Sequence, residues 1–258
     1  NTPPRAAGAK LLKRNLSDIA AMGGTPRHAL VHLLLARNTA TKWLEEFYRG
    51  LAQCCKRHGV TLAGGGIAQG PDGVFAADLF LLGEAGPKPL ARSGARLGDI
   101  LYVTGKLGGS ILGKHLSFTP RLAEGRWLAR QNGVRGMIDV SDGLAKDLPE
   151  ILPDGTDAKL SIALLPTAKA ARQLARRDGH SALEHALTDG EDYELLLAYA
   201  AKKDPAGFEK RWKKAFKTPL NRIGQIAPAL EKKHSRQLRD GRGQLLLSRQ
   251  AHGYEHLR

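Results

Sequence analysis

Short apolar runs and stretches with apolar residues at helical spacing follow one another along this chain. Runs rich in Val, Ile and Leu that are bounded by Gly, Pro or polar residues predict strands. We expect strands at 29–36, 60–63, 74–82, 99–104, 136–140, 159–164, 192–199 and 221–226. Apolar residues that recur every three or four positions predict helices at 15–22, 41–59, 110–116, 119–133, 141–152, 167–177 and 204–216. Strands and helices mix without strict alternation, so the predicted fold class is α/β (α+β).

A connecting segment interrupts both patterns near the end of the first third of the chain. Residues 83–98 are rich in Gly, Pro and Arg, a composition typical of a connection between folded units. We therefore predict two domains, residues 1–90 and 91–258.

Length and composition limit the classes of protein that this chain can represent. Its 258 residues are 42% hydrophobic, enough for an ordinary buried core. The longest apolar run, 29–36, is interrupted by His32 and is far shorter than a membrane span, so we predict no membrane partner. Cys54 and Cys55 are adjacent in a helical pattern and suit neither a disulfide framework nor a zinc site. A reduced, cytoplasmic location fits them best.

The net charge of +15 raises the question of nucleic-acid binding. Residues 202–258 hold 15 Lys and Arg against 5 Asp and Glu, so most of the excess lies at one end of the chain. Phe208, Trp212 and Phe216 recur every four residues there, which predicts a core-facing stripe with the lysines on the solvated side of the helix. We therefore predict no nucleic-acid partner; a basic binding module remains the alternative that charge alone supports.

A strand-to-helix junction at 139–143 is the strongest chemical signal in the sequence. Asp139 stands among apolar residues, and Ser141, Asp142 and Gly143 follow it. Carboxylate oxygens are ligands for Mg²⁺, and a helix N-terminus attracts phosphates. The alternative is an ordinary helix N-cap, for which Ser and Asp are common.

Four further segments carry charge or glycine in places where a core would not require them. Asp18 leads an apolar helix, although the helix dipole also favours an acid in the first turn. Gly64–Gly66 follow a strand and either approach a phosphate or form a turn. Arg92 either binds a phosphate or solvates a loop. Segment 188–195 holds four acids within six residues.

The order of these motifs closely resembles the thiamine-monophosphate kinase family, which belongs to the aminoimidazole-ribonucleotide-synthetase-like ATP-binding superfamily. The resemblance extends from about residue 3 to 257. It rests on Asn-Leu-Ser-Asp-Ile-Ala-Ala-Met-Gly at 15–23, Gly-Gly at 64–65, Arg-Ser-Gly-Ala-Arg-Leu-Gly-Asp at 92–99, Asp-Val-Ser-Asp-Gly-Leu at 139–144 and Gly-Glu-Asp-Tyr-Glu-Leu at 190–195.

The resemblance implies a fold and a reaction. The implied N-terminal domain shares a barrel with a second subunit, so a homodimer is expected, and a C-terminal α/β domain packs against it. The implied enzyme is a phosphotransferase with a phosphate acceptor, which converts ATP and thiamine monophosphate to ADP and thiamine diphosphate by direct in-line transfer. Mg²⁺ and ATP are the implied cofactors, because cations must offset the repulsion between two phosphates. The acceptor phosphate is already ionised near neutral pH, so no catalytic side chain is expected.

The resemblance also implies roles for individual residues. The implied metal ligands are Asp18, Asp139 and Asp142. The implied ATP contacts are Gly64, Gly65, Arg92 and Ser141. Glu191 matches the family's thiamine-phosphate contact, and Ala251 occupies the position of an aromatic residue that lies against the thiamine rings.

Three departures from the family pattern bear on activity. Gly66 stands where the family has a metal-binding aspartate, and Asp72 or Asp78 are the candidates to replace that carboxylate. The family's Gly-Asp-Asp and Ser-Thr-Asp segments do not precede Asn1, so we expect a fragment that lacks the first strands of the N-terminal domain. With Ala251 at the aromatic position, the contact with the thiamine rings is either lost or provided by another side chain. The alternatives to a kinase are therefore a binding-only relative and a sister enzyme of the superfamily with another substrate.

Overall fold

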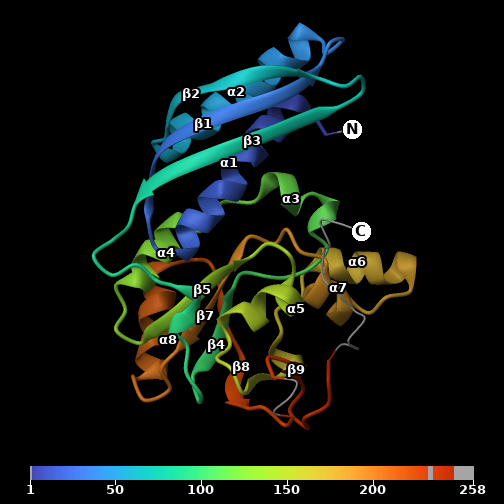
Figure 1. Ribbon diagram of the computed structural model, residues 1–258. Coiled ribbons are helices and arrows are strands. Elements are labelled where there is room, and N and C mark those ends of the chain that lie inside the picture. Colours follow the sequence, from blue (N-terminus) through green and yellow to red (C-terminus); the bar gives the residue numbers. More distant parts are fainter. Residues whose placement is uncertain (1, 232–234, 247–258) are drawn as a thin grey trace.

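The computed structural model of the protein describes residues 2–231 and 235–246, which form two sheets and the helices that cover them (Figure 1). The strands are β1 Thr25–Ala36, β2 Thr61–Gly70, β3 Phe75–Glu84, β4 Ile100–Thr104, β5 Val134–Val140, β6 Thr156–Leu160, β7 Glu194–Tyr199, β8 Leu220–Pro228 and β9 Leu238–Arg239. The helices are α1 Pro4–Ala21, α2 Thr41–His58, α3 Lys114–Ser117, α4 Leu122–Ala129, α5 Leu144–Asp147, α6 Lys169–Asp178, α7 Ala182–Thr188 and α8 Pro205–Ala215. The mixed α/β class predicted from the sequence is confirmed.

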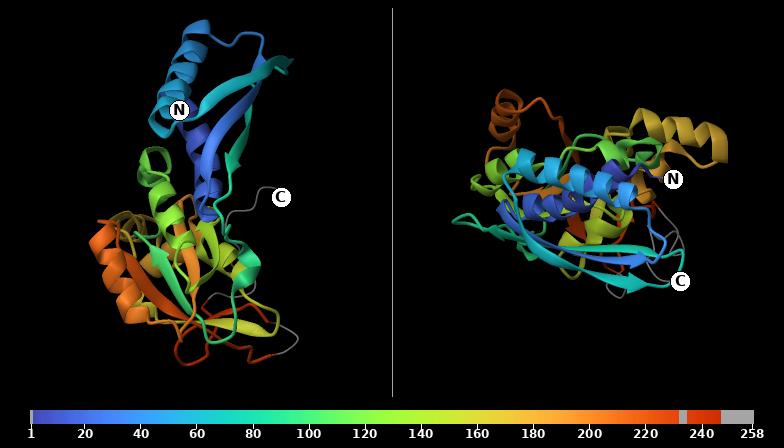
Figure 2. Two further views of the ribbon diagram at one scale, coloured as in Figure 1. Left: turned by 90° about the vertical axis from the view of Figure 1, so that its left-hand side faces the viewer. Right: turned by 90° about the horizontal axis from the view of Figure 1, so that it is seen from above.

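The first sheet has three strands in the order β2-β1-β3, with β1 parallel to β2 and antiparallel to β3. Helices α1 and α2 lie against one face of this sheet (Figure 2). Alternation along β1 buries Ala29, Val31 and Leu33 on the helix side. The opposite face exposes Leu30 and, on β3, Phe80, which is 69% exposed, and no described element covers it.

The three consecutive glycines lie inside β2, which corrects the prediction of a strand confined to 60–63 and excludes the alternative that the glycines form a turn. Gly65 has φ 153°, and a Cβ there would lie 1.7 Å from the carbonyl oxygen of Val31 on the neighbouring strand. The register between β1 and β2 shifts at Ala29/Leu30, immediately beside it. Glycine is therefore required because the two backbones approach closely at a bulge, and the strand continues through it.

The second sheet has six strands in the order β5-β7-β4-β8-β6-β9, and apolar clusters pack on both of its faces. Leu195 and Leu197 of β7 join the apolar cluster that includes Phe208, whereas Leu196 and Ala198 join a second cluster on the other side. All six residues of β7 are buried. Phe208 and Trp212 of α8 are 0% and 2% exposed, which confirms that the aromatic stripe faces the core.

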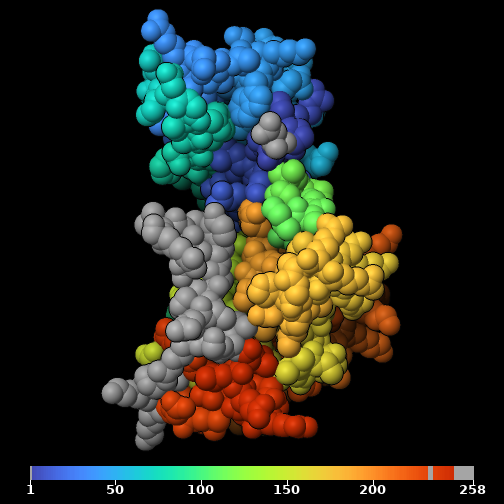
Figure 3. Space-filling view, turned by 90° about the vertical axis from the view of Figure 1, so that its right-hand side faces the viewer, coloured from blue at the N-terminus to red at the C-terminus, as the bar shows by residue number. Residues whose placement is uncertain are grey.

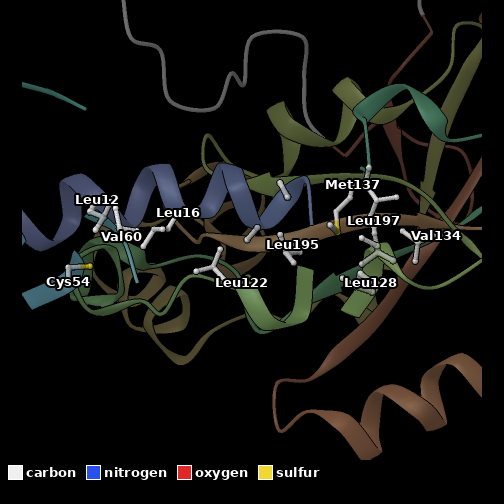
Figure 4. Packing of buried hydrophobic residues seen from close by; sticks show 14 of the residues in the cluster. Leu12, Leu16, Cys54, Val60, Leu122, Leu128, Val134, Met137, Leu195 and Leu197 are labelled. Carbon is white, nitrogen blue, oxygen red and sulfur yellow. The ribbon is translucent and has the colours of Figure 1, made fainter. Parts of the chain in front are cut away.

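One apolar cluster joins the two sheets. It extends from Leu12 and Leu16 on α1 to Met137 on β5 and Leu197 on β7 (Figure 4). In Figure 3 the α3 segment, in light green, lies directly below the N-terminal elements. The predicted boundary at residues 90 and 91 falls in the connection between β3 and β4, and the division into domains stays a prediction because the core continues across it.

Several predicted elements have different bounds in the structure. Helix α1 begins at Pro4 rather than at residue 15, because proline is well suited to the first turn of a helix. The predicted helix at 119–133 is only Leu122–Ala129, with Pro120 ahead of it. Helix α7 was not predicted; it begins with a capping box formed by Ser181 and Glu184. No helix in the described ranges has the length and hydropathy of a membrane span.

Candidate active site

A cavity of about 560 Å³ opens where α1, the end of β5 and the loop before β7 meet. Acidic and basic side chains from these three elements line it. They are Lys10, Arg14, Asp18, Asp139, Ser141, Asp142, Asp189, Glu191 and Tyr193. The structure therefore brings together five residues that the resemblance singled out, from segments more than 100 positions apart.

Helix α1 supplies a polar stripe to the wall of this cavity. Lys10, Arg14 and Asp18 are spaced four residues apart, so they lie on one face of the helix. Asp18 lies in the last turn of α1, where a negative charge is disfavoured by the helix dipole, so the interpretation of Asp18 as a first-turn acid is wrong. Burial raises the pKa of Asp18, and the positive charges of Arg92 and Arg14 oppose that rise.

Asp139 lies at the base of the cavity and is only 4% exposed. The hydroxyl of Ser17 donates a hydrogen bond of 2.6 Å to its Oδ2 atom, which ties α1 to β5. Burial raises the pKa of Asp139 to about 6; the hydrogen bond from Ser17 opposes the rise and the nearby charge of Asp18 adds to it. A cation bound nearby would therefore favour the ionised form of the Asp139 carboxylate near neutral pH.

The backbone after β5 is held by a carboxylate that the sequence analysis did not identify. Asp147 Oδ2 accepts hydrogen bonds from the backbone N–H groups of Ser141 and Asp142, at 2.9 and 3.0 Å. Burial raises the pKa of Asp147 to about 7. The N-cap of α5 is Gly143 and has no side-chain cap, so Ser141 and Asp142 are not the capping residues that the alternative required. The sequence gives one signal for Asp147, which is that an acid stands in the first turn of a short helix.

Two of the four carboxylates in segment 189–194 are buried and support the fold. Asp192 accepts hydrogen bonds of 2.9 and 3.1 Å from the backbone N–H of Gly108, and burial raises its pKa to about 6. Glu194 accepts hydrogen bonds of 2.8 and 2.9 Å from Arg121. Burial by itself would raise the pKa of Glu194, but neighbouring cations, Arg121 foremost, hold it below its usual value.

The other two carboxylates line the cavity. Glu191 lies 2.5 Å from the ammonium of Lys10 and accepts a 3.2 Å hydrogen bond from the hydroxyl of Tyr193. Asp189 accepts a 2.6 Å hydrogen bond from the backbone N–H of Gly109. This division between structural and cavity-lining acids follows from the loop conformation and is not visible in the sequence.

The acidic loop and the end of β5 form one unit. The backbone N–H of Glu191 donates to the carbonyl of Ser141 at 2.6 Å, and that of Tyr193 to the carbonyl of Val140 at 2.8 Å. Both Glu191 and Tyr193 have φ 51°, a left-handed conformation that costs about 1 kcal/mol or more for residues other than glycine. The two hydrogen bonds maintain this conformation and direct Glu191 toward Lys10.

The predicted ATP contacts are only partly assembled in one copy of the chain. Ser141 lines the cavity, and Arg92 is close enough for its charge to act on Asp18 and Asp139. Gly64 and Gly65 line a different, open cavity next to Tyr48 on α2. The structure therefore does not bring the glycines into the acidic cavity, because β2 is an edge strand of the other sheet.

The position of Gly66 is also outside the acidic cavity. Gly66 pairs with His32 on β1, and His32 pairs with Asp78 on β3, so these three residues form one row across the sheet. Neither Asp72 nor Asp78 lines the acidic cavity. Ala251 lies outside the described residues.

The carboxylates share a cavity without forming a finished metal cage. Within residues 2–231 and 235–246, no three acid, histidine or cysteine side chains are grouped closely enough to hold a metal ion. Mg²⁺ usually takes one or two carboxylates, keeps several waters and binds substrate phosphates, so it does not need such a cage. The hard oxygen donors of Asp18, Asp139 and Asp142 fit an ion bound in that way.

Comparison with known proteins identifies the family to which this fold and this acidic cavity belong. Residues 1–85 match the family model of AIR synthase related protein, N-terminal domain. The chain is 39% identical over 220 residues to the thiamine-monophosphate kinase of Rhodopirellula baltica, covering 85% of this chain and 68% of that protein. The chain belongs to the thiamine-monophosphate kinase family.

Solved structures agree with this assignment over nearly the whole chain. The thiamine-monophosphate kinase of Stenotrophomonas maltophilia superposes with a TM-score of 0.79 at 29% identity, covering 95% of this chain and 80% of that one. AaThiL, solved in complex with AMPPCP and TMP, superposes with a TM-score of 0.82 at 25% identity, covering 100% of this chain and 82% of that one. The resemblance inferred from the order of motifs is thus confirmed at the level of family and fold.

Proposed function

We propose that this protein phosphorylates thiamine monophosphate to thiamine diphosphate, using ATP as donor in a direct in-line transfer. The observation that carries the proposal is the convergence of Asp18, Asp139 and Asp142 with Glu191 on one cavity. Family membership agrees with it, and AaThiL was solved with a nucleotide analogue and TMP. The role of the chain is to position the two reactants. Their phosphates are already ionised, so the chain need not remove a proton.

The side chains around the cavity divide this work. Asp18, Asp139 and Asp142 would hold Mg²⁺, which supplies charge neutralisation between the two anionic reactants when it is bound. Glu191, fixed by Lys10 and Tyr193, forms the acceptor end of the cavity. Ser141, whose backbone is fixed by Asp147, presents its hydroxyl at the donor end. Arg92 would contact the nucleotide from outside the cavity wall.

A homodimer in the cytoplasm is part of the proposal. The uncovered face of the three-stranded sheet exposes Leu30, Phe80 and Leu82, an apolar surface that a second copy would bury. Gly64 and Gly65 lie on the same sheet, apart from the acidic cavity, so their predicted role in ATP binding requires an arrangement that one copy lacks. Free, buried Cys54 and Cys55 agree with a reducing compartment.

Substitution of Asp139 tests the kinase proposal directly. We expect Asp139→Asn to lower kcat by about 10³-fold. The substitution removes a proposed ligand of Mg²⁺, the cation that would offset the repulsion between the phosphates. Asp154→Asn, which removes a 93% exposed carboxylate elsewhere, is the matched control and should leave kcat unchanged. Production of thiamine diphosphate from ATP, Mg²⁺ and thiamine monophosphate is the measurement. Equal activity of the two variants would contradict the assignment of Asp139.

Gly66 specifically favours a second function, that of a relative that binds the same ligands without transferring phosphate. No side chain stands at this position to supply the carboxylate that the family has there. Gly66→Asp is accommodated if the ring of His32 shifts, since the new Cβ would lie 3.0 Å from His32 Cδ2. If the wild type binds nucleotide without turnover and Gly66→Asp restores transfer, the binding-only function is correct. If Gly66→Asp does not change activity, the assignment of position 66 to the site is wrong.

A further inference from the structure

Arg14 is the uncommitted cation of the acidic cavity. It lies on α1 between Lys10 and Asp18, four residues from each, and lines the same wall. Lys10 is bound to Glu191 at 2.5 Å, whereas the guanidinium of Arg14 forms no hydrogen bond or ion pair with any residue that the structure describes. A guanidinium left free among carboxylates is available to an anion that enters the cavity.

Arg14 lines the same cavity as Asp18 and Tyr193, which lie at the two ends of the proposed site. Its charge acts on Asp18, at the end where the carboxylates gather, by opposing the rise in pKa that burial causes. The same charge acts on the hydroxyl of Tyr193, where burial also raises the pKa. Tyr193 in turn contacts Glu191, at the acceptor end. Arg14 therefore shares one cavity with the proposed metal ligands and the proposed acceptor contact, and its charge acts at both ends.

Asp142 and Asp189, two other charged groups of the cavity, already have partners. Asp142 pairs with Lys146 at 3.0 Å, and Asp189 is held by Gly109 and by His185 at 2.9 Å. Two anionic reactants that meet here would thus find Arg14 free to rotate toward them. A planar guanidinium suits this role because two of its N–H groups can contact two oxygens of one phosphoryl group.

We propose that Arg14 is a catalytic residue whose guanidinium contacts the phosphoryl group while it passes from donor to acceptor. The inference rests on the proposed kinase function and deepens it. In the transfer, an oxygen of the acceptor phosphate forms a bond to the γ-phosphorus as the bond to the β–γ bridging oxygen breaks. The electron pair of that bond stays on the β-phosphate of ADP, and no proton has to move. Arg14 stabilises the charge on the equatorial oxygens at that moment.

Kinetics of Arg14 variants test the proposal. We expect Arg14→Gln to lower kcat by about 10²-fold or more, with the KM values for ATP and thiamine monophosphate changed by less than about threefold. Arg14→Lys should fall between, because it keeps the charge and loses the two-pronged contact. Added guanidinium ion should restore part of the kcat of Arg14→Ala, which a purely structural defect would not allow. Wild-type kinetics for Arg14→Gln, or an effect confined to KM, would overturn the proposal.

Arg5→Gln is the matched control for these measurements. It removes one positive charge from the same helix, at a residue whose guanidinium pairs with Glu46 at 2.9 Å and does not line the cavity. Equal thermal unfolding of Arg14→Gln and Arg5→Gln excludes a folding defect. Equal losses of kcat in the two variants would overturn the proposal, because they would reflect net charge alone.

A binding measurement separates failure of this inference from failure of the proposed function. If the wild type does not transfer phosphate, the kinase proposal fails, and calorimetry with inorganic pyrophosphate and Mg²⁺ decides the role of Arg14. Arg14 as a phosphate contact predicts that the wild type and Arg5→Gln bind pyrophosphate about tenfold or more tightly than Arg14→Gln. Equal affinities in all three proteins, absence of binding included, would overturn the role of Arg14.

Discussion

The two sheets of this protein differ in how completely the chain itself surrounds them. The six-stranded sheet has apolar clusters on both faces, and every residue of β7 is buried. The three-stranded sheet has helices on one face only and exposes Phe80 and Leu82 on the other. Both sheets border predicted binding residues, but the acidic cavity beside the six-stranded sheet collects five of them, whereas the open cavity on the three-stranded sheet holds only Gly64 and Gly65.

This difference explains why the Asp-x-Ser-Asp motif lies in the acidic cavity and the glycine motif does not. The Asp-x-Ser-Asp motif follows a buried strand whose neighbours in the sheet supply the rest of the cavity. The glycine motif lies in an edge strand with a free side, so its surroundings depend on what else pairs with or covers that sheet. A motif therefore specifies a site within the chain only when the surrounding core fixes the other walls.

The comparison predicts that loss of a buried ion pair near the six-stranded sheet is the most damaging change. We expect Arg121→Ala to lower the free energy of unfolding by about 3 kcal/mol, because it leaves the buried carboxylate of Glu194 without its two-pronged partner. Arg27→Ala, on the three-stranded sheet, breaks an exposed pair with Glu84 and should cost much less, because solvent screens exposed charges. Urea denaturation measures both, and similar losses would remove the contrast between the sheets.

A substitution at Gly65 tests how much the edge of the three-stranded sheet matters. Gly65→Ala should lower the free energy of unfolding by about 2 kcal/mol, because its Cβ would overlap the carbonyl oxygen of Val31 and its φ is 153°. Gly64→Ala is the control, since its Cβ would meet only Leu30 Cδ2 at 3.6 Å. Thermal or urea unfolding distinguishes them. If both variants are equally stable, β2 is free to separate from β1 at little cost.

The pH dependence of stability sharpens the description of the acidic cavity. The pKa of Asp147 is about 7 in the folded chain against 3.8 ordinarily, so its contribution to stability is fully present below about pH 4 and is lost as the pH rises through 7. Asp147→Asn keeps an acceptor and cannot ionise. Its stability relative to the wild type should therefore increase by about 2–3 kcal/mol from pH 5 to pH 8 without Mg²⁺.

Urea unfolding at both pH values measures this increase. Asp154→Asn serves as the control, because that side chain is 93% exposed. An Asp147→Asn difference that is the same at pH 5 and pH 8 would show that Asp147 is not ionising inside the fold in this range.

The smallest effect on folding is expected on the uncovered face. Phe80→Lys changes a side chain that is 69% exposed, so the free energy of unfolding of the single chain should change by less than about 0.5 kcal/mol. The same change should abolish self-association if a second copy covers this face, because a charge would be buried against Leu30 and Leu82. Sedimentation of wild type and variant measures this, and an unchanged association state would mean that copies associate elsewhere or not at all.

The sequence was sufficient to predict much of the fold, and the misses have physical causes. The amphipathic pattern from Thr41 and the left-handed Gly59 placed α2 almost completely. The helix predicted at 15–22 begins at Pro4 in the structure, and this start was missed although proline fits a first turn. That error concealed Lys10 and Arg14, whose spacing from Asp18 puts them on the cavity side only if the helix extends back to Lys10.

The residue types and their order along the chain were enough to identify the family, the mixed fold class and five of the residues that line the cavity. Tertiary structure alone decided that Asp192 and Glu194 serve the fold while Glu191 faces the cavity. It also decided that Asp147 holds the backbone of Ser141. Gly64 and Gly65 lie apart from the acidic cavity for the same reason. Local patterns report which side chains are available, since hydrophobic spacing and capping depend on neighbours in sequence. The direction in which each side chain points depends on loop conformations and strand order, which distant parts of the chain determine together.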